Sequence, residues 1–135
     1  MALADFLKLH AVGIVTFLVV DLVWLGVVAR GFYRSHMGPL LREDIQWVPA
    51  IVFYLLFTGC LILFAVMPAM ERSSPWRAIL LGGLFGCAAY ATYDLTNLAT
   101  LRGFPTLVAI VDIVWGTVLA AIVAAVTYQV GRLVT

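Results

Sequence analysis

Four long apolar runs dominate this sequence and constrain its fold. They cover approximately residues 9–29, 47–67, 76–101 and 106–130. A helix needs about 20 residues to cross the hydrocarbon core of a bilayer, so each run is long enough to span it. The sequence therefore predicts an all-α polytopic membrane protein with a single domain, residues 1–135. We expect four transmembrane helices in an up-down-up-down bundle, with both termini on one face.

The composition excludes a water-soluble fold of this size. Hydrophobic residues make up 64% of the chain and charged residues 11%, with a mean hydropathy of +1.10. A soluble domain carries about 25% charged residues. A cleaved signal peptide is the alternative interpretation of the first run. Asp21 and Trp24 argue against it, because they lie late in the run, where a signal peptide stays apolar.

Other functional classes lack their sequence signatures. The net charge is +1 and there is no basic stripe, which argues against nucleic-acid binding. We find no CxxC, HExxH, GxGxxG or P-loop motif, so we expect no cofactor and no metal site. Cys60 and Cys87 lie inside apolar runs and are interpreted as small hydrophobic residues rather than as a disulfide or metal ligands. His10 and His36 are far apart in the predicted topology, which argues against a shared metal.

The connections between the runs contain recognisable turn and cap signals. Residues 30–46 form the longest connection and are polar. Pro68 is expected to end the second helix, and Ser73 or Ser74 to cap the third. Residues 102–105 are expected to form a tight turn before the fourth helix.

The loop charges leave the orientation nearly balanced. We call the face with the termini the near face, and the face with the first and third connections the far face. Lysine and arginine normally favour the cytoplasmic side. Each face holds four of them: Lys8, Arg72, Arg77 and Arg132 on the near face, and Arg30, Arg34, Arg42 and Arg102 on the far face. The free amino terminus favours cytoplasmic termini, and the tie leaves dual insertion open.

Three aspartates fall at one depth in the predicted bundle. Asp21 and Asp94 come shortly before the far ends of the first and third runs, and Asp112 shortly after the far end of the fourth. At about 1.5 Å per residue, each lies about 10–13 Å below the far face. Tyr54 lies at a similar distance from the start of the second run. This coincidence predicts a layer of polar residues in the far half of the bundle.

Helical spacing groups these acids with aromatic and polar partners. Residues three or four apart share a helix face, so each aspartate should point inward together with its partner. The inward orientation is expected because lipid makes an exposed charge costly. The residues predicted to bind a ligand or a proton are Asp21, Trp24, Tyr54, Tyr90, Tyr93, Asp94, Asn97, Asp112 and Trp115. For the two tryptophans, interior packing and a pocket wall that stacks on a flat or cationic ligand both remain open.

No lysine or arginine lies inside the far halves of the runs to neutralise these acids. At least one aspartate should therefore be protonated near neutral pH, or the layer should hold a cation or a ligand that donates hydrogen bonds. The alternative is purely structural, since intramembrane polar groups can also join helices. Arg30 and Arg34 follow the first run. They are interpreted either as solvated charges that anchor the helix end or as contacts to an anionic headgroup.

The chain resembles a known family through four stretches. These are DLVWLG at residues 21–26, GFYR at 31–34, YATYDLTNLATLRG at 90–103 and DIVWGT at 112–117. In these stretches, and over essentially the whole chain, the sequence is similar to the 2177 family of domains of unknown function. The resemblance implies a small four-helix protein of the bacterial inner membrane and a link to membrane lipids.

Three functional hypotheses follow. The leading one is non-enzymatic: the protein binds or translocates a small molecule or lipid, with proton-linked carboxylates. The second is a membrane-embedded enzyme that modifies lipids and uses paired aspartates for acid–base chemistry. The third is a scaffold for such enzymes. Membrane lipids are expected partners, and a homodimer is plausible because one four-helix bundle is small for a transporter.

Overall fold

The computed structural model describes residues 2–135, and this part of the chain is helical, without strands. Two π-helical turns, labelled η1 and η3, extend helices: η1 continues α1, and η3 joins α3 to α4. A short 3-10 turn is labelled η2. The elements in order are α1 (Leu3–Val23), η1 (Trp24–Val28), α2 (Arg30–Met37), η2 (Gly38–Leu40), α3 (Trp47–Leu61), η3 (Ile62–Val66), α4 (Met67–Glu71), α5 (Pro75–Thr100) and α6 (Thr106–Val134).

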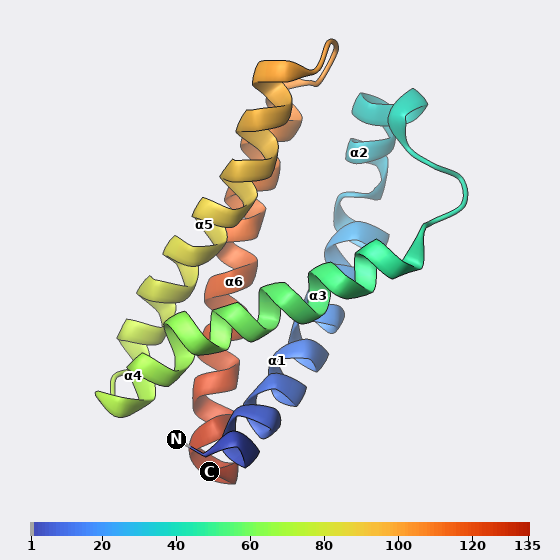
Figure 1. Ribbon diagram of the computed structural model, residues 1–135. Coiled ribbons are helices and arrows are strands. Elements are labelled where there is room, and N and C mark those ends of the chain that lie inside the picture. The colour runs from blue at the N-terminus through green and yellow to red at the C-terminus, as the bar shows by residue number, and fades with distance from the viewer. Residues whose placement is uncertain (1) are drawn as a thin grey trace.

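Four continuous helical segments are long and apolar enough to cross a membrane. They are Leu3–Val28, Trp47–Glu71, Pro75–Thr100 and Thr106–Val134, with 26, 25, 26 and 29 residues. They alternate in direction, and both termini lie at the same end (Figure 1). The predicted four-helix membrane fold is confirmed. The first helix begins at Leu3, earlier than predicted, because the charged residues of its first turns extend the helix toward the near face instead of ending it.

Pro68 does not end the second helix, contrary to the prediction. The helix continues through Pro68 to Glu71. A proline inside a regular helix clashes with the carbonyl four residues earlier and lacks an amide donor. Here the π-helical turn Ile62–Val66 lies directly before it, and its wider backbone accommodates the ring. Ser74, one of the two predicted caps, accepts a hydrogen bond from the backbone N–H of Arg77 at 3.1 Å.

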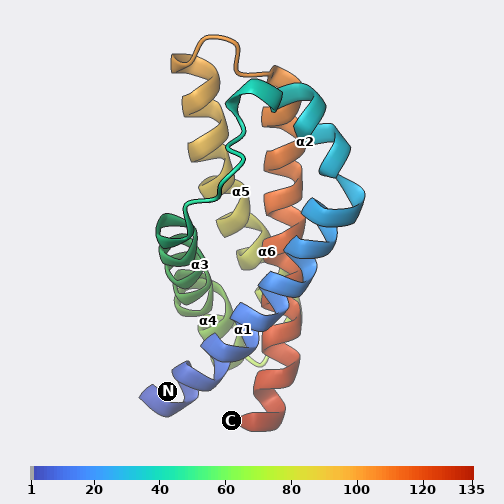
Figure 2. The same cartoon turned by 90° about the vertical axis from the view of Figure 1, so that its right-hand side faces the viewer.

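The connection at residues 30–46 contains a helix that the sequence analysis did not predict. α2 follows η1 almost directly and lies at the far end of the molecule (Figure 2). Its apolar side chains, which include Phe32 and Tyr33, pack on Phe104 in the turn before α6 and on Val108 in the first turn of α6. Arg30 and Arg34 remain exposed on its other side. Such an amphipathic helix is typical of the membrane–water boundary.

Helices α5 and α6 form the closest pair in the bundle. A Cβ atom on Gly86 would collide with the carbonyl oxygen of Gly116, and one on Gly82 would lie 3.0 Å from the carbonyl oxygen of Ala120. Small residues at such positions let two transmembrane backbones approach closely. This close packing fixes the register of α5 against α6, which sets where Asp94 and Asp112 meet.

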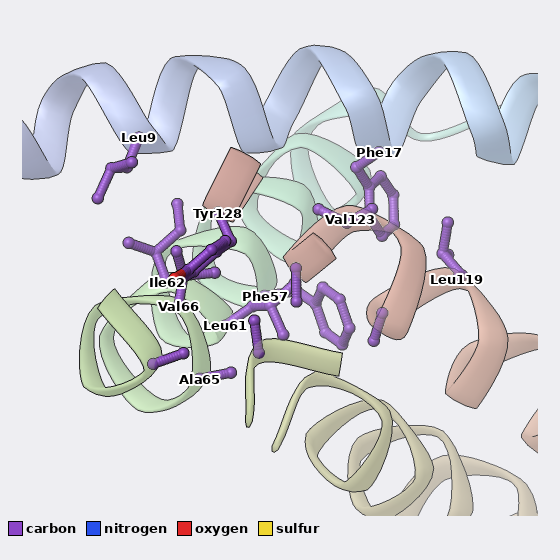
Figure 3. Close-up of a cluster of buried hydrophobic side chains, with 14 residues drawn as sticks. Leu9, Phe17, Phe57, Leu61, Ile62, Ala65, Val66, Leu119, Val123 and Tyr128 are labelled. Atoms are coloured by element: carbon purple, nitrogen blue, oxygen red, sulfur yellow. The ribbon is translucent and has the colours of Figure 1, made fainter. Parts of the chain in front are cut away.

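The hydrophobic core lies toward the near end. Figure 3 shows side chains from α1, α3 with its continuation, and α6 converging there, among them Phe17, Phe57 and Tyr128. α3 crosses the other helices steeply, and in both ribbon views it begins well below the far ends of α5 and α6. The helical segment that α3 begins approaches α5 mainly through its later parts, η3 and α4. The bundle is therefore tightly packed near the termini and opens between α3 and α5 in its far half.

Candidate functional site

A chain of aromatic and acidic side chains links α1, α2 and α6 in the far half. The indole Nε1 of Trp115 donates to Asp21 Oδ1 at 3.1 Å. The rings of Trp115 and Trp24 stack with centroids 4.4 Å apart and planes 8° apart. Trp24 Nε1 donates to the hydroxyl of Tyr33 at 3.3 Å, and that hydroxyl donates to Asp112 Oδ1 at 2.8 Å. Two aspartates on different helices are thus held by one continuous set of contacts.

The local sequence explains why the contacts cross between α1 and α6. α1 and α6 run antiparallel, and each carries an Asp-x-x-Trp pair on one face. Because the two pairs face one another, Trp115 of α6 reaches Asp21 of α1, and Trp24, at the start of η1, stacks on Trp115. Each tryptophan therefore covers one face of the other, and both residues also line a second, apolar cavity of about 270 Å³. The N–H of Trp115 holds Asp21, and the N–H of Trp24 holds the Tyr33 hydroxyl, which in turn donates to Asp112.

Tyr33 belongs to this cluster of contacts, although the sequence analysis did not include it among the candidate site residues. It sits on α2, outside the four spans, and bridges Trp24 and Asp112. Burial raises the pKa of its hydroxyl, and the Asp112 carboxylate raises it further against the opposing hydrogen bond from Trp24. The hydroxyl therefore stays protonated as a donor. Its spacing to Phe32 and Met37 in a short amphipathic stretch was the signal that could have identified it.

Asp94 of α5 is the most deeply buried acid in the protein. Its side chain has no solvent-exposed surface, and neither carboxyl oxygen accepts a hydrogen bond from a donor group in residues 2–135. It interacts with the neighbouring carboxyl of Asp112. A buried polar group without a partner is uncommon and costly. An ionisable group of this kind at membrane depth indicates a functional site.

A pocket of about 370 Å³ lies next to this pair of acids. Its lining consists of Phe53 from α3, Ala89, Tyr90 and Tyr93 from α5, and Asp112 from α6. Phe53 is 42% exposed and Tyr93 56%, so both lie at the side that faces lipid. The pocket thus occupies the opening between α3 and α5, with Asp112 of α6 among its lining residues.

The remaining predicted residues divide between this site and its surroundings. Asn97 is half-buried and lies beside Tyr93. Tyr54 lies on α3 and is close enough to Asp21 of α1 for their charges to interact. Its ring packs on Phe17 with centroids 5.4 Å apart. Arg30 and Arg34 are exposed at the far end, away from the pocket lining. No cluster of potential metal ligands occurs in the described chain.

Four apolar spans with acids buried between them define a multi-pass membrane protein. Residues 6–129 match the family model described as "Predicted membrane protein (DUF2177)", so the chain belongs to that family. The resemblance stated from the four sequence stretches is therefore confirmed. No curated protein and no solved structure shows a match to the chain.

Proposed function

We propose that this protein binds an amphiphilic small molecule or a lipid in the pocket between α3 and α5 and translocates its polar group along the buried acids. The observation that carries the proposal is Asp94, fully buried and without a hydrogen-bond partner, beside Asp112 in the wall of a pocket that opens sideways. Such a group gains most from a ligand that donates hydrogen bonds or positive charge.

The size and lining of the pocket support a small ligand. Small-molecule sites measure about 300–1,000 Å³ and combine an apolar lining with a few polar groups. This pocket measures about 370 Å³ and is lined mainly by aromatic rings, with Asp112 as its one acidic lining residue. A ligand with an apolar body therefore fits the rings, while its polar end reaches Asp112.

The adjacent acids supply the link to protons. Two carboxylates in direct contact repel each other strongly where the dielectric constant is low. A proton, a hydrogen-bond donor or a cation bound beside this pair would offset the repulsion. Exchange of a proton for the ligand would then couple ligand binding to proton movement.

The second candidate is a membrane-embedded enzyme that acts on lipid. The differing surroundings of the two acids favour it: Asp112 accepts a hydrogen bond from Tyr33, whereas Asp94 has no such partner. Neighbouring carboxyls in unlike environments suit acid–base chemistry. A scaffold role, the third hypothesis, would require neither acid.

The proposal places the protein in the bacterial inner membrane with cytoplasmic termini. Arg30 and Arg34, exposed on the polar side of α2, would contact anionic lipid headgroups there. A homodimer is part of the proposal, because a single bundle offers little space for a complete translocation path. These statements depend on the family resemblance and on the balance of loop charges.

Photolabelling tests the binding site. The full chain, in nanodiscs of zwitterionic lipid, is exposed to a long-chain alcohol that carries a diazirine midway along the chain. We expect label on α3 and α5 near Phe53 and Tyr93. Ala89→Trp should fill the pocket and remove this label, whereas Ala88→Trp, one residue away on the exposed side of α5, should not. Equal labelling of both variants would contradict the proposal.

Proteoliposomes then separate the candidate functions. Uptake of the bound amphiphile that depends on a pH gradient, and is lost in Asp94→Asn, supports translocation. Conversion of the amphiphile into a product of different mass, with no such dependence, supports the enzyme. Unchanged behaviour of Asp94→Asn and Asp112→Asn in both assays would support the scaffold instead.

A further inference from the structure

We infer that the polar end of the pocket's ligand is an organic ammonium cation. The inference rests on the proposed function and names the ligand chemistry of the same site. It is carried by the three aromatic rings and the carboxyl that converge on one pocket: Phe53, Tyr90, Tyr93 and Asp112.

The rings form a partial aromatic cage. The face of an aromatic ring carries negative charge, and ammonium groups are recognised by several rings around them, most strongly where water is excluded. Phe53 comes from α3, whereas Tyr90 and Tyr93 come from α5, so the rings line the pocket from two helices. A purely acyl-chain site would have no need of this grouping, because aliphatic side chains serve as well.

Neighbouring aromatic residues hold the rings in place. Tyr90 meets Phe57 edge to face, with centroids 5.9 Å apart and planes 81° apart. Tyr93 meets Phe104 in the same manner at 6.3 Å and 80°. Phe53 contacts Phe57 at 5.5 Å. Such edge-to-face pairs are favourable arrangements. The cage is therefore positioned before a ligand arrives.

The charges around the pocket favour a cation over other polar groups. Asp112 lines the pocket and Asp94 lies behind it, while no lysine or arginine pairs with either among the described residues. Among residues 2–135, the ion pair that does form joins Arg42 and Asp44, and it lies on the surface. An anionic headgroup would be repelled here. A bare metal ion would require several oxygen ligands, which the aromatic lining does not offer.

The size of the pocket suits a substituted ammonium group with part of an alkyl chain. At about 370 Å³ it exceeds the space needed for a trimethylammonium head, and its open side leads toward lipid. The alkyl chain can therefore leave between α3 and α5. A single-chain amphiphile with an ammonium end therefore matches the three aromatic rings, the acidic residue and the open side of the pocket.

A pair of isosteric probes tests this inference. Dodecyltrimethylammonium and its neutral analogue, in which a carbon atom replaces the nitrogen, have nearly the same shape. Each is measured as a radiolabelled probe on the full chain in zwitterionic nanodiscs, with binding to empty nanodiscs subtracted. We expect the cation to bind at least about tenfold more tightly, since ring and carboxylate contacts both act on its charge.

Two variants identify the groups responsible. Asp112→Asn keeps an oxygen acceptor for Tyr33 and should weaken binding of the cation by about tenfold or more, with little effect on the neutral probe. Tyr93→Leu, at an exposed position, should weaken cation binding severalfold. Asp44→Asn, on the surface, serves as the control and should change neither value.

The outcomes separate this inference from the proposed function. Equal affinity for the two probes would overturn the cation inference, while the pocket and its photolabelling would still support amphiphile binding. Binding of neither probe, with photolabelling of Phe53 and Tyr93 retained, would also overturn only the cation inference. Loss of binding and of photolabelling together would overturn both proposals.

Discussion

Asp94 is the residue whose environment departs furthest from what folding alone would select. A buried polar group without a hydrogen bond costs about 1–3 kcal/mol. The close contact between α5 and α6 holds Asp94 in place despite that cost, because the small residues of both helices determine how they meet. A group retained at the expense of stability is typical of a functional site.

Asp94→Asn should therefore raise the free energy of unfolding, by about 1 kcal/mol, while abolishing ligand uptake. The amide has nearly the same size and carries no charge to bury, and its N–H group can donate a hydrogen bond to the neighbouring Asp112 carboxyl. Unfolding can be followed in detergent by tryptophan fluorescence. Asp44→Asn, at an exposed position, is the control and should have no effect. A clear loss of stability in Asp94→Asn would mean that the carboxyl has a structural partner.

Trp115→Phe should have the opposite effect on stability. It removes the hydrogen bond to Asp21 and weakens the stack with Trp24, and together these contribute about 1–2 kcal/mol. The near-ultraviolet circular dichroism of the coupled indoles should disappear as well. Trp76→Phe, 65% exposed at the start of α5, should leave both the stability and the spectrum unchanged.

At the residue scale, spacing within each helix could be predicted and partners across helices could not. The Asp-x-x-Trp spacing predicted that Asp21 shares a face with Trp24, and Asp112 with Trp115. That each tryptophan serves the other pair depends on the register of α1 against α6, which is a non-local property. The amphipathic stretch around Tyr33 could have indicated a helix there, but the contact with Asp112 depends on where α2 folds back, which no local pattern determines.

At the scale of elements, the α5–α6 contact offers a matched pair of substitutions on one helix. A Cβ atom on Gly86 would collide with the backbone of α6, whereas one on Gly83 would lie 3.7 Å from the Cβ of Ala121, an ordinary contact. Gly86→Ala should therefore destabilise the protein by about 2 kcal/mol or more. Gly83→Ala should be tolerated. Thermal unfolding of the two variants, compared side by side, checks this; similar midpoints would refute the proposed contact.

The second element-scale prediction concerns α2. Tyr33→Phe removes the hydrogen bond to Asp112 that ties α2 to the bundle. Amide hydrogen exchange in residues 30–37 should accelerate severalfold, while exchange in α5 and α6 stays slow. Arg34→Gln, an exposed change on the same helix, is the control.

The pH dependence of this contact follows from the state of Tyr33. Burial raises the pKa of its hydroxyl above the usual value of about 10. The donating, protonated form therefore persists through the neutral and mildly alkaline range. Once exchange rates are corrected for intrinsic chemistry, the protection of α2 should be the same at pH 7 and at about pH 9.

Hydropathy was sufficient to predict the four spans, because a continuous apolar run of this length has few other stable environments. Hydropathy was insufficient to predict α2, because its polar residues are typical of a loop. The helix depends on packing against Phe104 and Val108, which the local sequence does not show. Pro68 was misinterpreted for a related reason. Its effect depends on the π-helical turn before it, and that turn has no sequence signature of its own.

At the scale of the whole molecule, the equal loop charges make orientation sensitive to single substitutions. Each face carries four lysine or arginine residues. Arg72→Gln removes one from the near face and should increase the fraction of chains whose carboxyl terminus is outside. Arg102→Gln should have the opposite effect. Accessibility of a C-terminal cysteine to a membrane-impermeant reagent measures that fraction in cells. An unchanged fraction in both variants would show that these charges do not determine orientation.

The steep tilt of α3 has a further consequence for the lipids that surround the protein. Its span of 25 residues is longer than a bilayer needs, and tilting is one way in which an over-long helix adapts to thickness. Longer acyl chains in the host bilayer would let α3 stand more upright and draw its far end toward α5. The mouth of the pocket would then narrow, so that membrane thickness itself would regulate how readily a ligand enters.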